Sequence, residues 1–504
     1  MDADDLGHSG HHCFRDGQRL SSGHWVDHTD HHAVTWRVRD LVLVAPLFAC
    51  GLTGPSSSQD EVREIPLAVD VDPDSATVAI ELRAEWTDRE IVEGRSTPAL
   101  TYRDVAAVSD DQPPLPGPLV EVEVGQTLDV WLTNGLPDRE TTLHFHGMRT
   151  PDVLDGNPLV RPGIDPGRTV LHRFVVQDPG LYWFHPHMFA DEHVELGLQG
   201  LVVVRARNEP RASRERIFVL DDVDLLPDGS MNVEPSHEDH HLGRHGPTVV
   251  VNGRAGGRIR AVAGATERWR FVNTANGRHF ALAMAGHRFD VIGFDGPPLD
   301  EVASMDVVEL APGERRDLLV HFDGAAGTLI QLETLDVSQG DHSGDWERTA
   351  LLTVELVPGD PGEPVEARDF LRPVERMSTA DVATRQVVLE AELHDGDMPV
   401  MRINGAVWPF GEPMEARFGE TEVWEIQNAS ELRHPFHVHG TFFQVIDRDG
   451  VAETLVAWRD TMPIGPRETV RIALRYDAPG RWMFHCQIPE HAHMGMMADF
   501  IVRE

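Results

Sequence analysis

The sequence predicts an all-β protein made of three consecutive β-sandwich domains, and three observations carry that prediction. Short runs with period-two alternation are separated by Gly, Pro, Asn and Asp turns almost to the end of the chain. No long helical periodicity interrupts these runs. Three blocks also share one plan, in which a glycine turn leads into a charged strand that ends near an Asn: VEVGQTLDVWLTN (122–134), VAGATERWRFVNT (262–274) and ARFGETEVWEIQN (416–428). Recurrence at roughly 150-residue spacing favours three related domains over one large sheet.

Turn-rich segments place the domain boundaries. One boundary falls near Arg207, and the other falls in the Pro- and Gly-rich VPGDPGEPVEARD at 357–369. The predicted domains are therefore 65–207, 208–360 and 361–504.

The N-terminal region contains an export-like signal. A basic run and the apolar stretch Leu41–Ala49 precede Cys50, so 37–50 resembles a bacterial lipoprotein signal in which Cys50 is lipidated and tethers the protein to a membrane. The alternatives are a simple cleaved signal and a buried strand. Residues 1–36 are a His-rich leader that is either disordered or precedes the true start, with a metal-gathering tail as the less favoured alternative, and 51–64 form a linker. We expect an extracytoplasmic protein, periplasmic or at the cell surface.

Composition excludes several classes of function. A formal charge of -39 over 504 residues argues against nucleic acid as a partner, because a polyanion would be repelled. A hydrophobic content of 41% fits a globular protein rather than a multi-span membrane protein. The three cysteines, Cys13, Cys50 and Cys486, are too few for a disulfide framework.

Histidine motifs carry the chemistry. They are HFH (144–146), HPH (185–187), HPFHVH (434–439) and HCQIPEHAHMGM (485–496). One His-x-His pair is weak evidence in a chain with 28 histidines. The pairs gain weight because they occur in the first and last blocks, beside a Cys that has His and Met at fixed offsets.

Strand geometry sorts these residues into two sites, because residues i and i+2 share a face while i+1 points the other way. One site would hold a thiolate, two imidazoles and a thioether, which is the ligand set of a blue-copper centre: Cys486, His434, His491 and Met496. The other would be an imidazole-only cluster too large for one metal: His144, His146, His185, His187, His437, His439 and His485. A structural zinc site does not fit, because zinc needs only four ligands and usually more thiolate.

At these residues the chain resembles the multicopper oxidases, the laccase-like family of three Greek-key cupredoxin domains. The resemblance covers roughly residues 65–504, including the VVNG, FDGPPL and LAPGERRDLLV stretches of the middle block. It implies four copper ions, with single electrons taken at a type 1 copper and dioxygen reduced to water at a trinuclear cluster. It implies type 1 ligands His434, Cys486, His491 and Met496, with His491 as electron entry, and type 2 ligands His144 and His437. It implies type 3 ligands His187, His439 and His485 for one copper and His146, His185 and position 487 for the other.

Position 487 departs from the family pattern, which has His where this chain has Gln487. A Gln carbonyl oxygen is a harder and weaker ligand, so we expect lower copper occupancy at one type 3 site or a changed cluster potential. The leading hypothesis is an oxidase with a modified cluster. The alternative is a non-catalytic copper-binding or electron-transfer protein with an impaired trinuclear site. A two-domain-type nitrite reductase is a weaker third option.

Proton delivery and the electron donor are less well specified by the sequence. Asp155 in DGNP matches an acidic residue of the family near type 2 and is a candidate proton donor, although Asp-Gly is also a common turn. Ala492 stands where several bacterial relatives have an acid. A Met axial ligand suits phenols, aromatic amines or cuprous ion as donors. The loop SHEDHHLGRHG (236–246) could collect metal ions, but a solvated surface loop is favoured.

Overall fold

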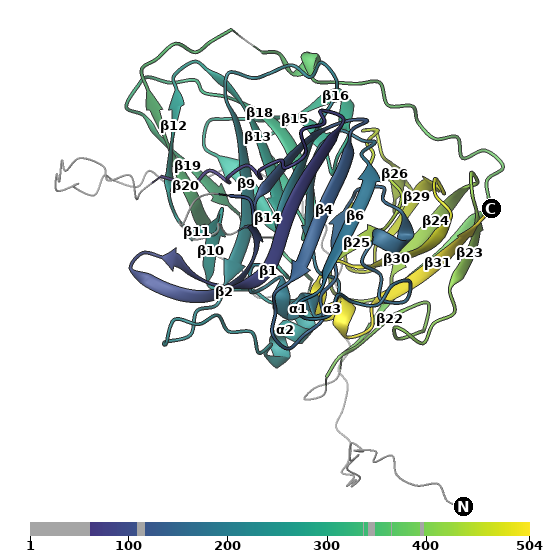
Figure 1. The fold of residues 1–504 in the computed structure, drawn as a ribbon. Helices are drawn as coiled ribbons and strands as arrows, with labels where there is room; N and C mark the ends of the chain where they lie inside the picture. Colours follow the sequence, from purple (N-terminus) through teal and green to yellow (C-terminus); the bar gives the residue numbers. More distant parts are fainter. Residues whose placement is uncertain (1–60, 108–115, 336, 341–347, 364, 394–397) are drawn as a thin grey trace, which may run out of the picture. The chain divides into compact units, whose positions relative to one another are not determined.

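The computed structural model describes residues 61–504 except 108–115, 336, 341–347, 364 and 394–397 (Figure 1). The leader at 1–36, the signal-like segment at 37–50 with Cys50, and most of the linker lie outside the described residues. Within the described part of the chain, no helix is long and apolar enough to cross a membrane.

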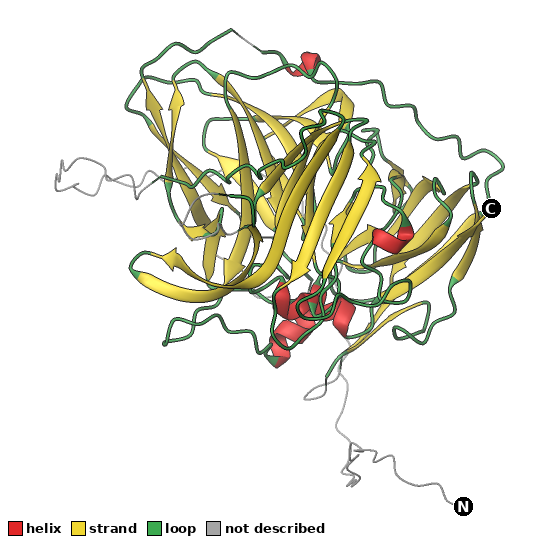
Figure 2. Ribbon diagram, in the orientation of Figure 1, coloured by secondary structure: helices red, strands yellow, loops and turns green. Residues whose placement is uncertain are grey.

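The predicted all-β class is confirmed, since β-strands dominate the described chain (Figure 2). The strands form pairs of sheets, and each pair draws its strands from one of the three ranges that the sequence divides. Each pair encloses its own apolar core, as expected for sandwiches.

The first sandwich packs a sheet of order β2-β1-β4-β6 against one of order β3-β8-β7-β5. Its strands are β1 (Thr77–Val92), β2 (Arg95–Asp104), β3 (Leu119–Glu123), β4 (Thr127–Asn134), β5 (His144–His146), β6 (Thr169–Val175), β7 (Gly180–His185) and β8 (Gly200–Arg205).

The second sandwich has sheets of order β11-β10-β9-β13-β18-β15-β16 and β12-β20-β19-β14-β17. Its strands are β9 (Glu215–Val223), β10 (Thr248–Val251), β11 (Arg254–Ala255), β12 (Arg258–Val262), β13 (Thr266–Asn273), β14 (Phe280–Met284), β15 (Phe289–Phe294), β16 (Pro298–Met305), β17 (Val307–Leu310), β18 (Arg315–His321), β19 (Leu329–Thr334) and β20 (Thr349–Val357).

The third sandwich has sheets of order β22-β21-β24-β29-β26-β27 and β23-β31-β30-β25-β28. Its strands are β21 (Thr384–Glu392), β22 (Val400–Ile403), β23 (Met414–Arg417), β24 (Thr421–Asn428), β25 (His434–Val438), β26 (Phe443–Arg448), β27 (Val451–Ala452), β28 (Thr461–Ile464), β29 (Thr469–Arg475), β30 (Gly480–Cys486) and β31 (Met497–Arg503).

The three similar sequence blocks become the equivalent strands β4, β13 and β24, and their terminal asparagines explain the recurrence. Asn134, Asn273 and Asn428 are all fully buried at the strand end. In each case the side-chain amide donates to two or more backbone carbonyls, and its oxygen accepts from the backbone N–H two residues on. An Asn here pins the loop that follows the strand, because its side chain satisfies buried backbone groups.

Short helices gather where the three sandwiches meet the candidate site. They are α1 (Ala190–His193), α2 (His237–Leu242) and α3 (Pro489–His493), and both α1 and α2 contact α3. There are also two 3-10 turns, η2 (Asp152–Leu154) and η3 (Ala367–Asp369). Helix α2 occupies the segment for which a surface loop was favoured. Its N-terminus is fixed by a capping box, in which Ser236 accepts from the Asp239 backbone and Asp239 accepts from the Ser236 backbone.

Candidate metal centre

A thiol and two imidazoles meet inside the third sandwich. His434 begins β25, Cys486 ends β30 and His491 lies on α3. The Nδ1 atoms of His434 and His491 each lie 3.6 Å from Cys486 Sγ. Met496 is placed beside them by its backbone, which accepts from the Cys486 N–H at 3.1 Å and donates to the His491 carbonyl at 3.0 Å. All four residues are fully buried.

The remaining ring nitrogens of these two histidines are held by hydrogen bonds. His434 Nε2 donates to Ser430 Oγ at 2.8 Å, and His491 Nε2 donates to the His241 carbonyl at 3.0 Å. Both Nδ1 lone pairs therefore face the sulfur, which is the tautomer a metal ligand needs. Burial lowers the pKa of His491 to about 4, holds the pKa of His434 well below its usual value, and raises the pKa of the Cys486 thiol.

A second cluster forms where the first and third sandwiches meet. Strand register aligns His144 with His185 in β5 and β7, and His437 with His485 in β25 and β30. Phe436 faces Cys486 in the same register, so the sulfur lies on the opposite side of the sheet from the imidazoles. Candidate ligand atoms within 4.8 Å of one another form three overlapping groups: His144, His146 and His437; His187, His439 and His485; and His144, Asp155 and His439.

The outer nitrogens of the cluster are tied to the protein. The Nδ1 atoms of five histidines donate to oxygens: His144 to Asp155 O, His185 to Pro186 O, His437 to Asp460 O, His439 to Asp155 Oδ2, and His485 to Cys486 O. His146 is reversed, and its Nε2 donates to Thr461 Oγ1 at 2.9 Å. Each of these rings therefore turns a bare lone pair toward the others.

These inward lone pairs have no protein partner. Among the described residues, His144 Nε2, His146 Nδ1, His185 Nε2 and His437 Nε2 are buried without a hydrogen bond. His439 Nε2 and His485 Nε2 lie 3.0 Å apart although both rings have given their proton outward. Each unsatisfied buried polar group costs about 1–3 kcal/mol, and facing lone pairs repel, so the arrangement favours bound cations. The residues present fit bound metal ions.

Two buried carboxylates contact different histidines of the cluster. Asp155 follows η2 and accepts from His439 Nδ1 at 2.6 Å, with its other oxygen 3.2 Å from His144 Nδ1. Asp460 lies 3.3 Å from His146 Nε2 and accepts from Arg315 Nη1 at 2.7 Å. Such carboxylates fix ring orientation and raise ligand basicity.

Comparison with known protein families matches the segments that contain both groups of candidate metal ligands. Multicopper oxidase family models match 95–209, 228–331 and 380–504. The multicopper oxidase MmcO of Mycobacterium tuberculosis is 30% identical over 432 residues, which cover 77% of this chain and 82% of that protein. The chain belongs to the multicopper oxidase family. Its members are copper-dependent oxidoreductases that use oxygen, and the resemblance inferred from the motifs is confirmed.

Further multicopper oxidases share the sequence and the fold. The laccase of Bacillus subtilis is 25% identical over 454 residues, covering 76% of this chain and 87% of the laccase. Among solved structures, a laccase from Pediococcus acidilactici has a TM-score of 0.75 at 26% identity, covering 88% of this chain and 94% of its own. McoA from Aquifex aeolicus has a TM-score of 0.75 at 25% identity, covering 88% and 100%. The prediction of three cupredoxin domains is confirmed.

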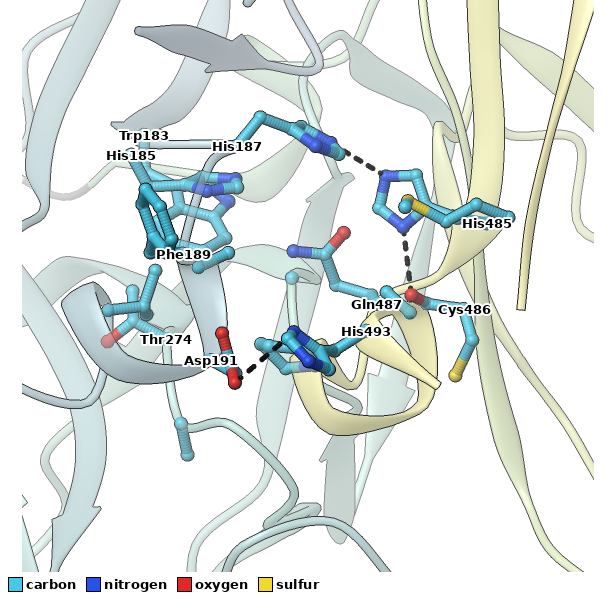
Figure 3. A pocket seen from close by; sticks show the side chains of 17 residues that line it. Trp183, His185, His187, Phe189, Asp191, Thr274, His485, Cys486, Gln487 and His493 are labelled. Carbon is cyan, nitrogen blue, oxygen red and sulfur yellow. Dashed lines mark hydrogen bonds and ion pairs between the residues drawn. The ribbon is translucent and has the colours of Figure 1, made fainter. Parts of the chain in front are cut away.

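Gln487 points into a cavity beside the imidazole cluster of this multicopper oxidase (Figure 3). The cavity has a volume of about 110 Å³, and its lining includes His185, His187 and His485. Gly313 has φ +85° and makes room for the amide, because a Cβ there would lie 2.7 Å from Gln487 Cγ and 3.0 Å from His146 Cε1. Gln487 Oε1 is buried and has no hydrogen-bond partner among the described residues. The amide oxygen is thus a bare acceptor at this cavity.

Sequence reasoning missed several groups around the two sites. Arg315, Asp460 and Thr461 brace the imidazole cluster, and Ser430 and the His241 carbonyl brace the thiol site. No local signal marks them, because each acts on a residue far along the chain or through its backbone. The resemblance implies electron entry at His491 near the surface, yet His491 has no exposed surface and lies beneath α2.

A half-buried aspartate between the first and second sandwiches gives a pH prediction. Asp221 on β9 accepts from Gln199 Nε2 at 2.9 Å and stands next to Asp222. Burial and then the Asp222 charge raise the pKa of Asp221 to about 7. The folded state therefore binds the proton more tightly than the unfolded chain, whose Asp pKa is about 3.9, so stability is lost as pH rises from about 4 to 7.

Asp221→Asn removes this charge and is expected to raise the free energy of unfolding by about 1–3 kcal/mol at pH 8, with little gain at pH 4.5. Thermal unfolding at both pH values checks this. Asp300→Asn, at an exposed aspartate, is the control and should show no such pH-dependent difference. An equal gain at both pH values would contradict the assignment.

Proposed function

We propose that this multicopper oxidase takes single electrons from a phenolic, aromatic amine or metal-ion donor at a type 1 copper. In this proposal dioxygen is reduced to water at a trinuclear copper cluster between the first and third domains. The observation that carries the proposal is the set of buried imidazole lone pairs that face one another without a protein partner. An electron-storage or structural role would not require an imidazole-only cluster beside a thiol site.

The residues would divide the four coppers as follows. The type 1 ligands would be His434, Cys486, His491 and Met496, and the type 2 ligands would be His144 and His437. One type 3 copper would take His187, His439 and His485, and the other would take His146, His185 and the Gln487 oxygen. When bound, the coppers supply one-electron acceptance at the first site and four-electron reduction of dioxygen at the second.

Residues of the chain orient the histidine rings, link the two sites covalently and deliver a proton to the imidazole cluster. His485 Nδ1 donates to the carbonyl of Cys486, so neighbouring residues connect the two sites through one peptide unit. Asp155 and Asp460 fix the rings of the cluster, and we assign proton delivery to Asp155 because its carboxylate is buried against His439 and His144. The cavity at Gln487 has room for several water-sized molecules beside the cluster.

Copper content and oxygen uptake of the wild-type protein test this function. After full copper loading we expect more than one copper per chain, a blue absorption band, and dioxygen uptake when an oxidisable phenol is added. Because Gln487 is a weaker ligand, the copper content should fall short of four under mild chelation. One copper per chain, with an intact blue band and no dioxygen uptake, would instead support the electron-transfer alternative.

A further inference from the structure

One buried arginine of the first sandwich has no partner for its charge. Arg89 lies on β1, and only 5% of its surface is exposed. Its Nε and Nη2 atoms are both buried, and neither has a hydrogen-bond partner among the described residues. Within the described chain, every other buried arginine donates a hydrogen bond. An unpaired buried charge is strongly destabilising, so this guanidinium requires an explanation.

The two unpaired nitrogens form one edge of the guanidinium, and elsewhere in this protein the same edge binds carboxylates. Arg149 donates from Nε and Nη2 to the two oxygens of Asp178 at 2.7 Å each. Arg385 binds Glu422 in the same way, also at 2.7 Å each. The two parallel N–H groups match two oxygens of a carboxylate, phosphate or sulfate. Arg89 therefore presents an oxyanion-binding edge on which none of the described acidic side chains lies.

A hydroxyl and a second arginine lie near this edge. Thr97 on β2 is directly opposite Arg89 in the strand register, so the two side chains lie on the same face of the hairpin. The Thr97 hydroxyl is buried and likewise has no partner among the described residues. Burial and then the charge of the exposed Arg63 lower the pKa of Arg89 to about 10. Two cations close enough to repel each other favour an anion between them, and a doubly charged anion most.

The acidic neighbours of Arg89 in the strand do not supply that anion. Alternation along β1 turns the carboxylates of Asp88 and Glu90 to the opposite face. Asp88 is exposed, and Glu90 lies 3.6 Å from Arg254 Nη2. On the other side, Arg63 lines an open groove of about 380 Å³. An ion from solvent can therefore approach the arginine pair from the side of Arg63.

We propose that Arg89, Thr97 and Arg63 bind a small tetrahedral oxyanion, phosphate or sulfate, where the first sandwich meets the second. Arg89 would hold two oxygens of the ion, the Thr97 hydroxyl would donate to a third, and Arg63 would balance the remaining charge. Asn252 of the second sandwich donates to the Arg63 carbonyl at 2.8 Å, and β1 contacts β11 of that sandwich (Figure 1). The bound ion would thus tie the segment before β1 to both sandwiches. This site shares no residue with the copper ligands, so the proposal does not depend on the proposed function.

Phosphate binding to the copper-loaded protein tests the site directly. Radiolabelled phosphate is measured by equilibrium dialysis in a chloride buffer of constant ionic strength. We expect the wild type to retain one equivalent, and Arg89→Met and Arg63→Met each to lower its affinity by about tenfold or more, since a charged hydrogen-bond donor is lost. Thr97→Val keeps the shape of the side chain and should lower the affinity by a smaller factor. The control Arg288→Met, at an exposed arginine of the second sandwich, should retain the equivalent.

Thermal unfolding separates loss of the site from loss of the fold. Arg89→Met removes an unpaired buried charge, so without phosphate it should unfold at or above the wild-type temperature. Phosphate should raise the unfolding temperature of the wild type more than that of Arg89→Met. Sulfate should displace the labelled phosphate, and acetate should not. Wild-type protein that binds neither phosphate nor sulfate overturns the proposal, because a water molecule would then satisfy Arg89. Retention of phosphate by Arg89→Met, or displacement by acetate as effective as that by sulfate, also overturns it.

Discussion

Replacing Gln487 with histidine is expected to raise copper retention toward four ions per chain and to increase the rate of dioxygen reduction by about tenfold or more. The amide oxygen of Gln487 is a harder and weaker ligand than imidazole, and losing even an outer partner of a metal ligand typically costs 10–100-fold in affinity or activity. The cavity around position 487 accommodates the imidazole, because Gly313 leaves the space beside His146 open.

The measurements are copper content after dialysis against a mild chelator and oxygen uptake with a fixed phenol. Gln386→His, at an exposed position on β21, is the matched control and should change neither quantity. A wild-type protein that already retains four coppers, together with a slower Gln487→His variant, would contradict this prediction. That result would mean that the amide oxygen is the better ligand for this cluster.

Alternation along strands explains why so much of the site is visible in the sequence. His485 and Cys486 are the last two residues of β30, so their side chains must point to opposite sides of the strand, and Gln487 follows directly after it. The register of β25 against β30 keeps that order, with His437 opposite His485 and Phe436 opposite Cys486. The recurring asparagines are also visible in the sequence because they act locally: each one satisfies backbone groups of the loop that follows its own strand.

Parts of the site that depend on packing between domains leave no such local pattern. Arg315 and Asp460 are separated by 145 residues, and nothing near either one indicates that they form a pair. The position of α2 over His491 likewise follows from how the second sandwich meets the third, and sequence reasoning therefore favoured a solvated loop there. The domain boundaries near Arg207 and at 357–369 and the roles assigned to single copper ligands stay predictions.

Arg315→Met is the substitution expected to destabilise the protein most, by about 3–5 kcal/mol, because it leaves buried charges without a partner. Arg315 joins all three sandwiches. Its Nε donates to the Leu181 carbonyl at 3.1 Å, its Nη1 donates to Asp460 Oδ1 at 2.7 Å, and its Nη2 donates to the Asp295 carbonyl. Burial and then the Asp460 charge raise the pKa of Asp295 to about 7. Asp295 and Asp460 therefore already repel each other, and the guanidinium of Arg315 is the cation that offsets this repulsion.

Thermal unfolding and copper content measure the effect. Arg288→Met removes an arginine from the exposed pair with Asp306 and should change stability by less than about 1 kcal/mol. The double variant Arg315→Met/Asp460→Asn removes the stranded charge as well, so it should be less destabilised than Arg315→Met alone. Since Asp460 also lies beside His146, the single variant should lose copper from the imidazole cluster while keeping the blue band of the thiol site. If the double variant were as unstable as the sum of the single variants, the two side chains would not act as a pair, and the bracing of the cluster by Arg315 would be wrong.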